Sequence, residues 1–196
     1  MDNALGNGLV ELTVGGRGSS LGSSLVASLD GGLDVLDHGL ELGADRLVTD
    51  ASDLVGADAL LLGGGYPELC ARQLSENVSM RNSIREAIEN GMPSVAECGG
   101  FMYLHESMTD EEGENWPMAG IITGSCHNRG KLVRFGYVNV TEQTSHFLAG
   151  KPVRAHEFHY YDSDNNGESC VAVKPVSGTS WTCIHEDDRN WWGYPH

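Results

Sequence analysis

The chain has 196 residues, of which 40% are hydrophobic and 20% are charged, and its formal net charge at pH 7 is -16. This charge argues against binding to nucleic acid or to an anionic membrane surface, because like charges repel. The length predicts one globular domain. We find no run of about 18 apolar residues that would predict a transmembrane helix, and the first residues lack the features of a secretory signal.

The five cysteines favour a reducing compartment. They are odd in number and irregularly spaced, and no C-x-x-C motif occurs: Cys70, Cys98, Cys126, Cys170 and Cys183. A disulfide framework is therefore disfavoured, and we expect a cytoplasmic protein with at least one free thiol.

The first 35 residues carry little pattern. Residues 9–14 alternate weakly and could form an opening strand. The glycine- and serine-rich stretch 15–24 superficially resembles a phosphate-binding loop, but its spacing fails the test. A G-x-G-x-x-G motif from Gly16 would need glycine where Leu21 stands, and no Gly-Lys-Ser/Thr follows. A turn region is the better interpretation.

From residue 34 the elements become clearer. Residues 34–42 predict a short helix that stops at Gly43, and residues 46–48 a short strand. Residues 57–62 predict a strand buried on both faces, which runs directly into a glycine-rich stretch, 63–68.

A helix is expected at 79–90, with Ser79 as N-cap and Gly91 at its C′ position. A strand at 93–97 and a helix start at 99–104 follow. This alternation of strands and helices predicts an α/β fold, a doubly wound, mostly parallel sheet with helices on both faces. Residues 109–116 are expected to form an acidic surface loop. The shorter strands expected beyond it extend the same domain; they lie at 120–122, 132–140, 170–173 and 182–184.

The strongest chemical signal is Cys98, between the strand at 93–97 and two glycines. A nucleophile on a sharp strand-to-helix turn projects from the sheet edge, and its neighbours must be small. The helix start would lower the pKa of the thiol, and the amide of Gly99 would face an oxyanion beside the sulfur. The turn alone does not distinguish this nucleophile from a small buried cysteine.

A second glycine loop supports the catalytic interpretation. Gly63-Gly64-Gly65-Tyr66-Pro67-Glu68-Leu69 follows the buried strand 57–62. In a parallel sheet this loop would meet the same edge as Cys98, where its amides could complete an oxyanion hole. A plain flexible connection is the alternative, although three glycines and a proline are more than a connection needs.

Four blocks in order carry a family resemblance: Gly63–Leu69, Ser75–Asn77, Ala96–Leu104 and His156–Tyr160. Together they resemble the glutaminase domain of cobyrinic acid a,c-diamide synthases, which are class I, triad-type glutamine amidotransferases. The resemblance covers about residues 40 to 196, implies a flavodoxin-like layout, and leaves residues 1–35 atypical. It implies hydrolysis of the glutamine side-chain amide through a γ-glutamyl thioester, with the ammonia used to amidate the a and c carboxylates of a corrinoid or related tetrapyrrole.

The resemblance also implies residue roles. Cys98 would be the nucleophile, and the substrate-binding and oxyanion region would comprise Gly64, Gly65, Gly99 and Gly100. The ending Trp192–His196 resembles the family's Tyr-x-His segment, so His196 is the expected base. Residues expected to shape the site are Tyr66, Glu68, His156, Glu157 and His159. Alternation along a strand would place His156 and His159 on opposite faces, so a zinc pair is disfavoured and no metal site is expected.

The family's ATP-dependent synthetase half contains a P-loop, and no such motif occurs here. The resemblance therefore implies that ATP and Mg²⁺ belong to a synthetase domain or subunit that this chain lacks, and that no cofactor is needed in this domain. Glutamine and that synthetase are the expected partners, and a homodimer stays open. Two alternatives also stay open: a catalytically weak module that needs a synthetase partner, and another cysteine hydrolase, such as a peptidase or redox sensor, on the same fold.

Overall fold

The computed structural model describes residues 39–42, 54, 57–144, 148 and 150–196. The strands expected at 9–14 and 46–48, and the glycine-rich stretch 15–24, lie outside these residues. The helix expected at 34–42 is wrong where it can be compared. Gly39–Leu42 forms strand β1, which pairs in parallel with β2 (Ala59–Leu62) over its whole length.

The central sheet has the strand order β1-β2-β3-β13-β12. It is parallel except for its last pair, and its remaining strands are β3 (Ser94–Glu97), β12 (His185–Glu186) and β13 (Asn190–Gly193). This parallel sheet confirms the α/β class. Strand β13 lies directly beside β3, with Gly193 opposite Glu97. The last residues of the chain are thereby brought to the end of the strand that precedes Cys98.

Helical segments follow β2 in the order η2 (Pro67–Cys70), α2 (Ala71–Glu76) and α3 (Val78–Glu89). Helix α3 buries Met80, Ile84 and Ile88, as its spacing predicts. The cap differs from the expectation. Asn77 is the N-cap, and its side-chain oxygen accepts a hydrogen bond from the Met80 amide at 3.2 Å. Asn77 precedes Ser79 by two residues and is an equally good capping residue.

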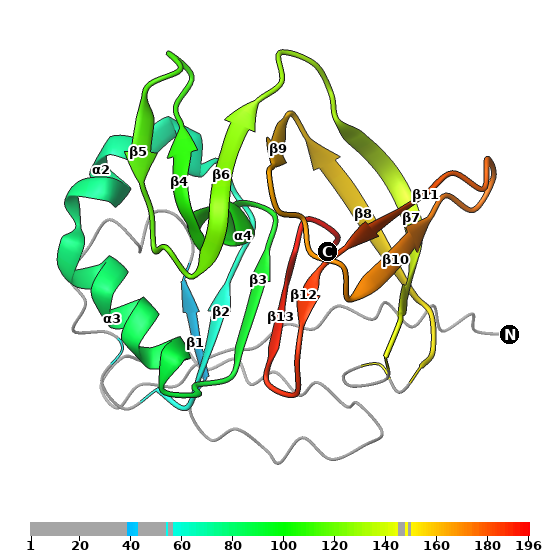
Figure 1. Ribbon diagram of the computed structural model, residues 1–196, viewed down its shortest axis with the longest axis horizontal. Coiled ribbons are helices and arrows are strands. Elements are labelled where there is room, and N and C mark those ends of the chain that lie inside the picture. The colour runs from blue at the N-terminus through cyan, green and yellow to red at the C-terminus, as the bar shows by residue number, and fades with distance from the viewer. Residues whose placement is uncertain (1–38, 43–53, 55–56, 145–147, 149) are drawn as a thin grey trace, which may run out of the picture.

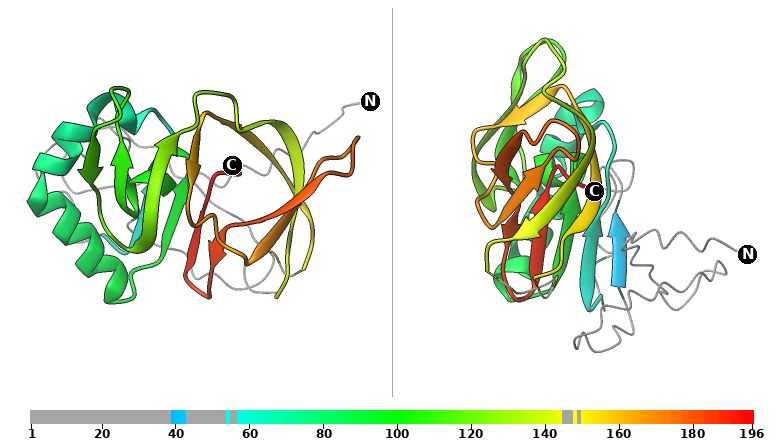
Figure 2. Two further views of the ribbon diagram at one scale, coloured as in Figure 1. Left: turned by 45° about the horizontal axis from the view of Figure 1, so that its top comes forward. Right: turned by 90° about the vertical axis from the view of Figure 1, so that its right-hand side faces the viewer.

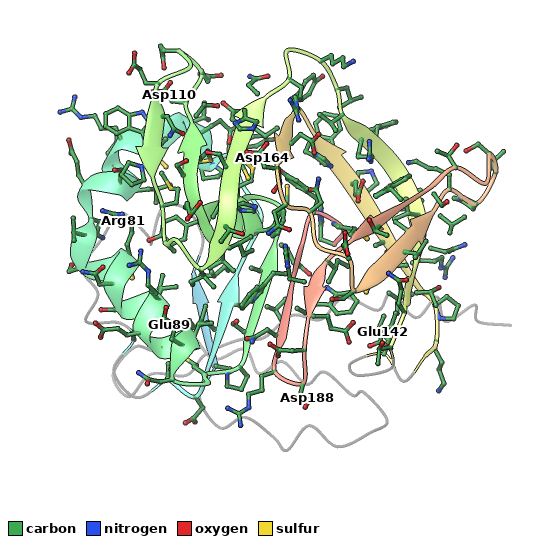
Figure 3. The ribbon with its side chains drawn as sticks, viewed as in Figure 1. Arg81, Glu89, Asp110, Glu142, Asp164 and Asp188 are labelled. Atoms are coloured by element: carbon green, nitrogen blue, oxygen red, sulfur yellow. The ribbon has the colours of Figure 1, made fainter. Side chains whose placement is uncertain are left out.

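A second, four-stranded sheet has the order β5-β4-β6-β9. Its strands are β4 (His105–Thr109), β5 (Asn115–Pro117), β6 (Ile122–Asn128) and β9 (Tyr161–Ser163). The acidic stretch expected to be a loop is the β4–β5 hairpin. Asp110 lies near its tip (Figure 3) and accepts hydrogen bonds from the Glu114 amide and the Trp116 indole. These bonds shape a tight turn that periodicity alone did not reveal.

A third, antiparallel sheet has the order β11-β10-β7-β8. Its strands are β7 (Arg134–Glu142), β8 (Val153–His159), β10 (Cys170–Val173) and β11 (Ser180–Cys183). It lies on the side of the molecule opposite α2 and α3, and the C-terminal residues lie between (Figure 1). The two further views show the same separation (Figure 2).

The buried apolar residues form two clusters. The larger joins β2, β3, α3 and α4 (Gly99–Tyr103) to the second sheet, and the smaller lies within the third sheet and around Ile184. No helix in the described part of the chain is long and apolar enough to cross a membrane.

Candidate active site

Cys98 occupies a strained turn between β3 and α4. Its φ is 49° and its ψ is -105°, a conformation that a non-glycine residue rarely adopts. Strain of this kind costs on the order of 1–3 kcal/mol and is typical of nucleophiles held out from a sheet edge. The Cys98 amide donates to the Gly193 carbonyl at 2.9 Å, so strand β13 helps to fix the turn.

The two glycines after Cys98 allow the glycine loop to approach. A Cβ on Gly99 would lie 2.8 Å from the Gly65 carbonyl oxygen, and one on Gly100 would lie 2.1 Å from the Leu62 carbonyl oxygen. The Gly100 amide donates to the Gly63 carbonyl at 3.0 Å. The Gly100 amide therefore joins the two loops. Because it already donates to Gly63, it is not available to stabilise an oxyanion, contrary to the expectation.

Gly64 and Gly65, which are expected in the oxyanion region, lie close to Cys98. Both border the cavity that contains Cys98, and a Cβ on Gly64 would be 3.8 Å from the Cys98 Cβ. Gly65 has a φ of 146°, which favours glycine. The Gly99 amide hydrogen-bonds to the Cys98 sulfur and favours its thiolate.

A cavity of about 360 Å³ brings most of the expected site residues together. Its lining comprises Gly64, Gly65, Tyr66, Glu68, Cys98, Met102, His156, Phe158, His159, Tyr160, Tyr161 and His196. Four of these were missed by the sequence analysis: Met102, Phe158, Tyr160 and Tyr161. Their sequence positions were a usable signal, because Met102 follows Cys98 by about one helical turn, Phe158 and Tyr160 belong to the His156–Tyr160 block, and Tyr161 follows it. Gly99, Gly100 and Glu157 lie outside the lining.

His196 is held beside this cavity by its backbone and by its ring. Its amide donates to the His156 carbonyl at 3.1 Å, and its carbonyl accepts from the His156 amide at 2.7 Å. Its Nδ1 donates to the Tyr194 carbonyl at 2.9 Å. A proton fixed on Nδ1 leaves Nε2 as the basic nitrogen.

The other two cavity histidines make further ring contacts, and the His156 ring lies edge-to-face against the His196 ring at a centroid distance of 6.1 Å. The His156 ring makes edge-to-face contacts with Phe135 and Tyr137, at centroid distances of 6.0 and 5.3 Å. The His159 ring is buried and stacks on Tyr194 at 3.8 Å. Thus the rings of His156 and His159 contact different aromatic side chains, although both residues border the cavity. The family resemblance still favours His196 as the expected base.

The electrostatics of Cys98 oppose the expected activation. Burial is the largest cause that raises the pKa of its thiol to about 11; the carboxylates of Glu68, Glu97 and Glu157 also act to raise it, while the Gly99 amide lowers it. The expectation of a lowered pKa is therefore wrong. Helix α4 has only five residues, and its positive end is outweighed by burial and by the surrounding negative charge. At neutral pH the thiol needs a base.

Glu97 is an acidic group whose place near the base the sequence analysis did not identify. Burial raises its pKa, and the nearby His196 lowers it.

Among the described residues, no group of three or more His, Cys, Asp or Glu side chains is arranged to hold a metal ion.

A cysteine on a strained strand-to-helix turn, with a histidine across the same cavity, defines the class of α/β proteins built for thiol nucleophiles. The family model for the CobB/CobQ-like glutamine amidotransferase domain matches residues 31–196. The chain belongs to this family.

Similar proteins agree with this assignment. The chain is 40% identical over 138 residues to a cobyrinate a,c-diamide synthase of Caldanaerobacter subterraneus subsp. tengcongensis, with 67% of this chain and 30% of that protein covered. It is 39% identical over 143 residues to the Fusobacterium nucleatum protein of that name, covering 71% and 31%. The chain therefore spans about a third of the length of these relatives.

A solved structure of a glutamine amidotransferase has the same fold. It aligns with a TM-score of 0.53 at 15% identity and covers 75% of this chain and 74% of its own.

Proposed function

We propose that the chain is the glutaminase part of a cobyrinate a,c-diamide synthase type of amidoligase. The observation that carries this proposal is the strained Cys98 turn, which shares one cavity with His196. Family membership supports glutamine as the nitrogen source, and the names of the relatives support a corrinoid acceptor.

In the proposed mechanism, His196 Nε2 takes the proton of the Cys98 thiol as the sulfur attacks the glutamine side-chain carbonyl carbon. The amides of the Gly64–Gly65 loop and of Gly99 stabilise the oxyanion. The imidazolium returns its proton to the leaving nitrogen, and ammonia departs. Water, deprotonated by His196, then cleaves the γ-glutamyl thioester to glutamate and restores the thiol. A base is essential because the pKa of Cys98 is raised to about 11.

Ammonia would be used by a synthetase part that activates the a and c carboxylates with ATP and Mg²⁺. Exposed aromatic side chains support a partner next to the cavity. Phe158 and Tyr160 line it, and Phe135 and Tyr137 continue the exposed set along β7. Such aromatic groups are typical of protein interfaces.

The proposal is tested by measuring glutamate release from glutamine. Wild-type chain should release glutamate and equimolar ammonia, Cys98→Ala should release none, and His196→Ala should be slower by about 10² or more. Cys70→Ala is the matched thiol control and should behave as wild type, since Cys70 lies outside the cavity lining. Unchanged hydrolysis in Cys98→Ala would overturn the mechanism.

A partner-dependent module is a second candidate, favoured by the raised pKa of Cys98. Adding the remaining portion of a full-length relative should then raise kcat for glutamate release by about tenfold or more, as typical coupling energies allow. An unchanged kcat in the presence of a bound synthetase portion would reject this candidate.

A further inference from the structure

Strand β8 carries an unusually deep acid–imidazole pair. The residue exposures are 1% for Glu157 and 7% for His159, and the two side chains project from the same face of the strand. Glu157 Oε2 and His159 Nε2 are 3.7 Å apart, and neither atom has a hydrogen-bond partner among the described residues. Burying such polar atoms is costly, so the pair requires a compensating role.

The pair lies against the segment that bears His196. The His159 ring stacks on the Tyr194 ring at 3.8 Å with an interplanar angle of 4°. Its Nδ1 donates to the Tyr161 carbonyl at 2.6 Å, so its Nε2 is the nitrogen that faces Glu157. Tyr194 is itself 4% exposed, and its carbonyl accepts the His196 Nδ1–H.

A small polar cavity adjoins the pair. It has a volume of about 10 Å³, roughly that of one water-sized probe, and Glu157, His159 and Tyr194 all line it. Arg134 and Asp162 also line this cavity. His159 thus contacts the Tyr194 ring directly, and Glu157 borders the same cavity.

We propose that Glu157 and His159 are positioning residues for His196. They hold the Tyr194 ring, and with it the carbonyl that keeps the His196 proton on Nδ1 and presents Nε2 to Cys98. This inference rests on the proposed role of His196 as base. Outer groups that fix the tautomer and direction of a functional imidazole have large effects on activity without touching substrate.

Two substitutions separate this role from simple packing. Glu157→Gln keeps the shape and removes the charge, and His159→Phe keeps a flat ring on Tyr194 and removes both nitrogens. Each should lower kcat for glutamate release by about tenfold to a hundredfold, because small misplacement of a catalytic group is costly. KM for glutamine should change less than about twofold in Glu157→Gln, since Glu157 lies outside the cavity lining. The double variant should be no slower than the worse single variant, because the two act as a unit.

Glu142→Gln is the matched control. Glu142 is also buried, but it lies at the far end of β7 and accepts hydrogen bonds from the amides of Leu148 and Gly150 (Figure 3). This variant should lose stability and keep the wild-type kcat. If all three variants merely lower Tm and keep kcat, the pair only packs the core and the proposal is overturned.

The ¹⁵N imidazole spectrum of His196 gives a readout independent of activity. Wild type should show one neutral tautomer with the proton on Nδ1, and Glu157→Gln and His159→Phe should show a mixture. If wild type is inactive but the variant spectra differ from the wild-type spectrum in this way, the glutaminase proposal fails, while the effect of the pair on the His196 tautomer stands. If wild type is active and the variants match it in both kcat and spectrum, only the positioning inference fails. Should one variant not fold, the other carries the test.

Discussion

At the scale of single residues, the backbone conformation of Cys98, rather than a lowered pKa of its thiol, is what favours its role as a nucleophile. Its positive φ projects the sulfur into the cavity, whereas burial and three nearby carboxylates keep the proton on it. A protonated resting thiol protects the nucleophile from adventitious oxidants and makes reaction depend on the base. The sequence identified the residue from its glycine neighbours, but the burial and the charges come from residues distant in the chain.

The raised pKa makes a pH prediction. Without substrate, alkylation of Cys98 by iodoacetamide should keep rising between pH 9 and 11, because the reactive thiolate forms only as pH approaches the folded pKa of about 11. Peptide mapping by mass spectrometry separates Cys98 from the partly exposed Cys70. A rate that levels off by about pH 8.5, the ordinary thiol value, would contradict the result.

Glu68 offers a second prediction at this scale. Among the residues that line the cavity it is the acidic one, and its charge acts on Cys98. A free glutamine carries an α-ammonium group that needs an anionic partner. Glu68→Gln should therefore raise KM for glutamine about tenfold and leave kcat nearly unchanged.

The matched control for Glu68 is a substrate rather than a variant. Glutaramate, which lacks the α-amino group, should be hydrolysed equally by wild type and Glu68→Gln. If the substitution weakens both substrates alike, Glu68 does not bind the ammonium group.

At the scale of elements, the site depends on contact between two glycine turns. The first follows β2 and the second begins α4, and Gly100 lies where they touch. Local patterns predicted β2, α3, β3 and the start of α4, because each has its own periodicity and turn residues. Strand β13 could not be placed beside β3 in this way, since parallel pairing across more than ninety residues leaves no local signal. That pairing brings the segment with His196 to the cavity that Cys98 lines.

A substitution at the contact tests its importance. Gly100→Ala would put a Cβ 2.1 Å from the Leu62 carbonyl, and backbone must move to relieve it. Overpacking of this kind costs about 1–3 kcal/mol, which corresponds to a drop in Tm of roughly 3–10 °C for a chain of this size. Gly63→Ala is the control, because its Cβ would meet nothing within 4 Å. Equal Tm values for the two variants would refute the close contact.

At the scale of the whole molecule, one buried histidine ties helix α4 to the second sheet. His105 Nδ1 donates to the Phe101 carbonyl at 2.9 Å, and its Nε2 accepts from the Ser163 hydroxyl at 2.6 Å. It thereby joins α4 and β4 to β9. Burial lowers its pKa to about 4, so the folded chain holds it neutral.

This histidine predicts loss of stability in acid. The unfolded chain binds a proton at His105 near pH 6.5, whereas the folded chain does not until about pH 4. The stabilising contribution is therefore complete above pH 6.5 and declines as pH falls toward 4, by about 3 kcal/mol. Urea unfolding at pH 7 and pH 4.5 measures the decline, which should be smaller in His105→Asn. His127→Asn, on the exposed pair with Asp164, should keep the wild-type decline. An equal decline in His105→Asn would remove His105 as its cause.

The five cysteines differ in their position relative to the cavity. None of the five forms a disulfide with another described residue, in line with their irregular spacing. Four of them, Cys70, Cys126, Cys170 and Cys183, lie outside the cavity lining. The chemistry proposed for the chain thus depends on Cys98 alone.

The most direct test is covalent capture of Cys98 by an electrophilic glutamine analogue such as a diazo-ketone. Intact mass spectrometry of the wild-type chain should show a single adduct, and peptide mapping should place it on Cys98. Excess glutamine should slow its formation, and Cys98→Ala should form none. An adduct that forms equally on Cys70, or one that glutamine does not slow, would contradict the assignment of Cys98 as a glutamine-directed nucleophile.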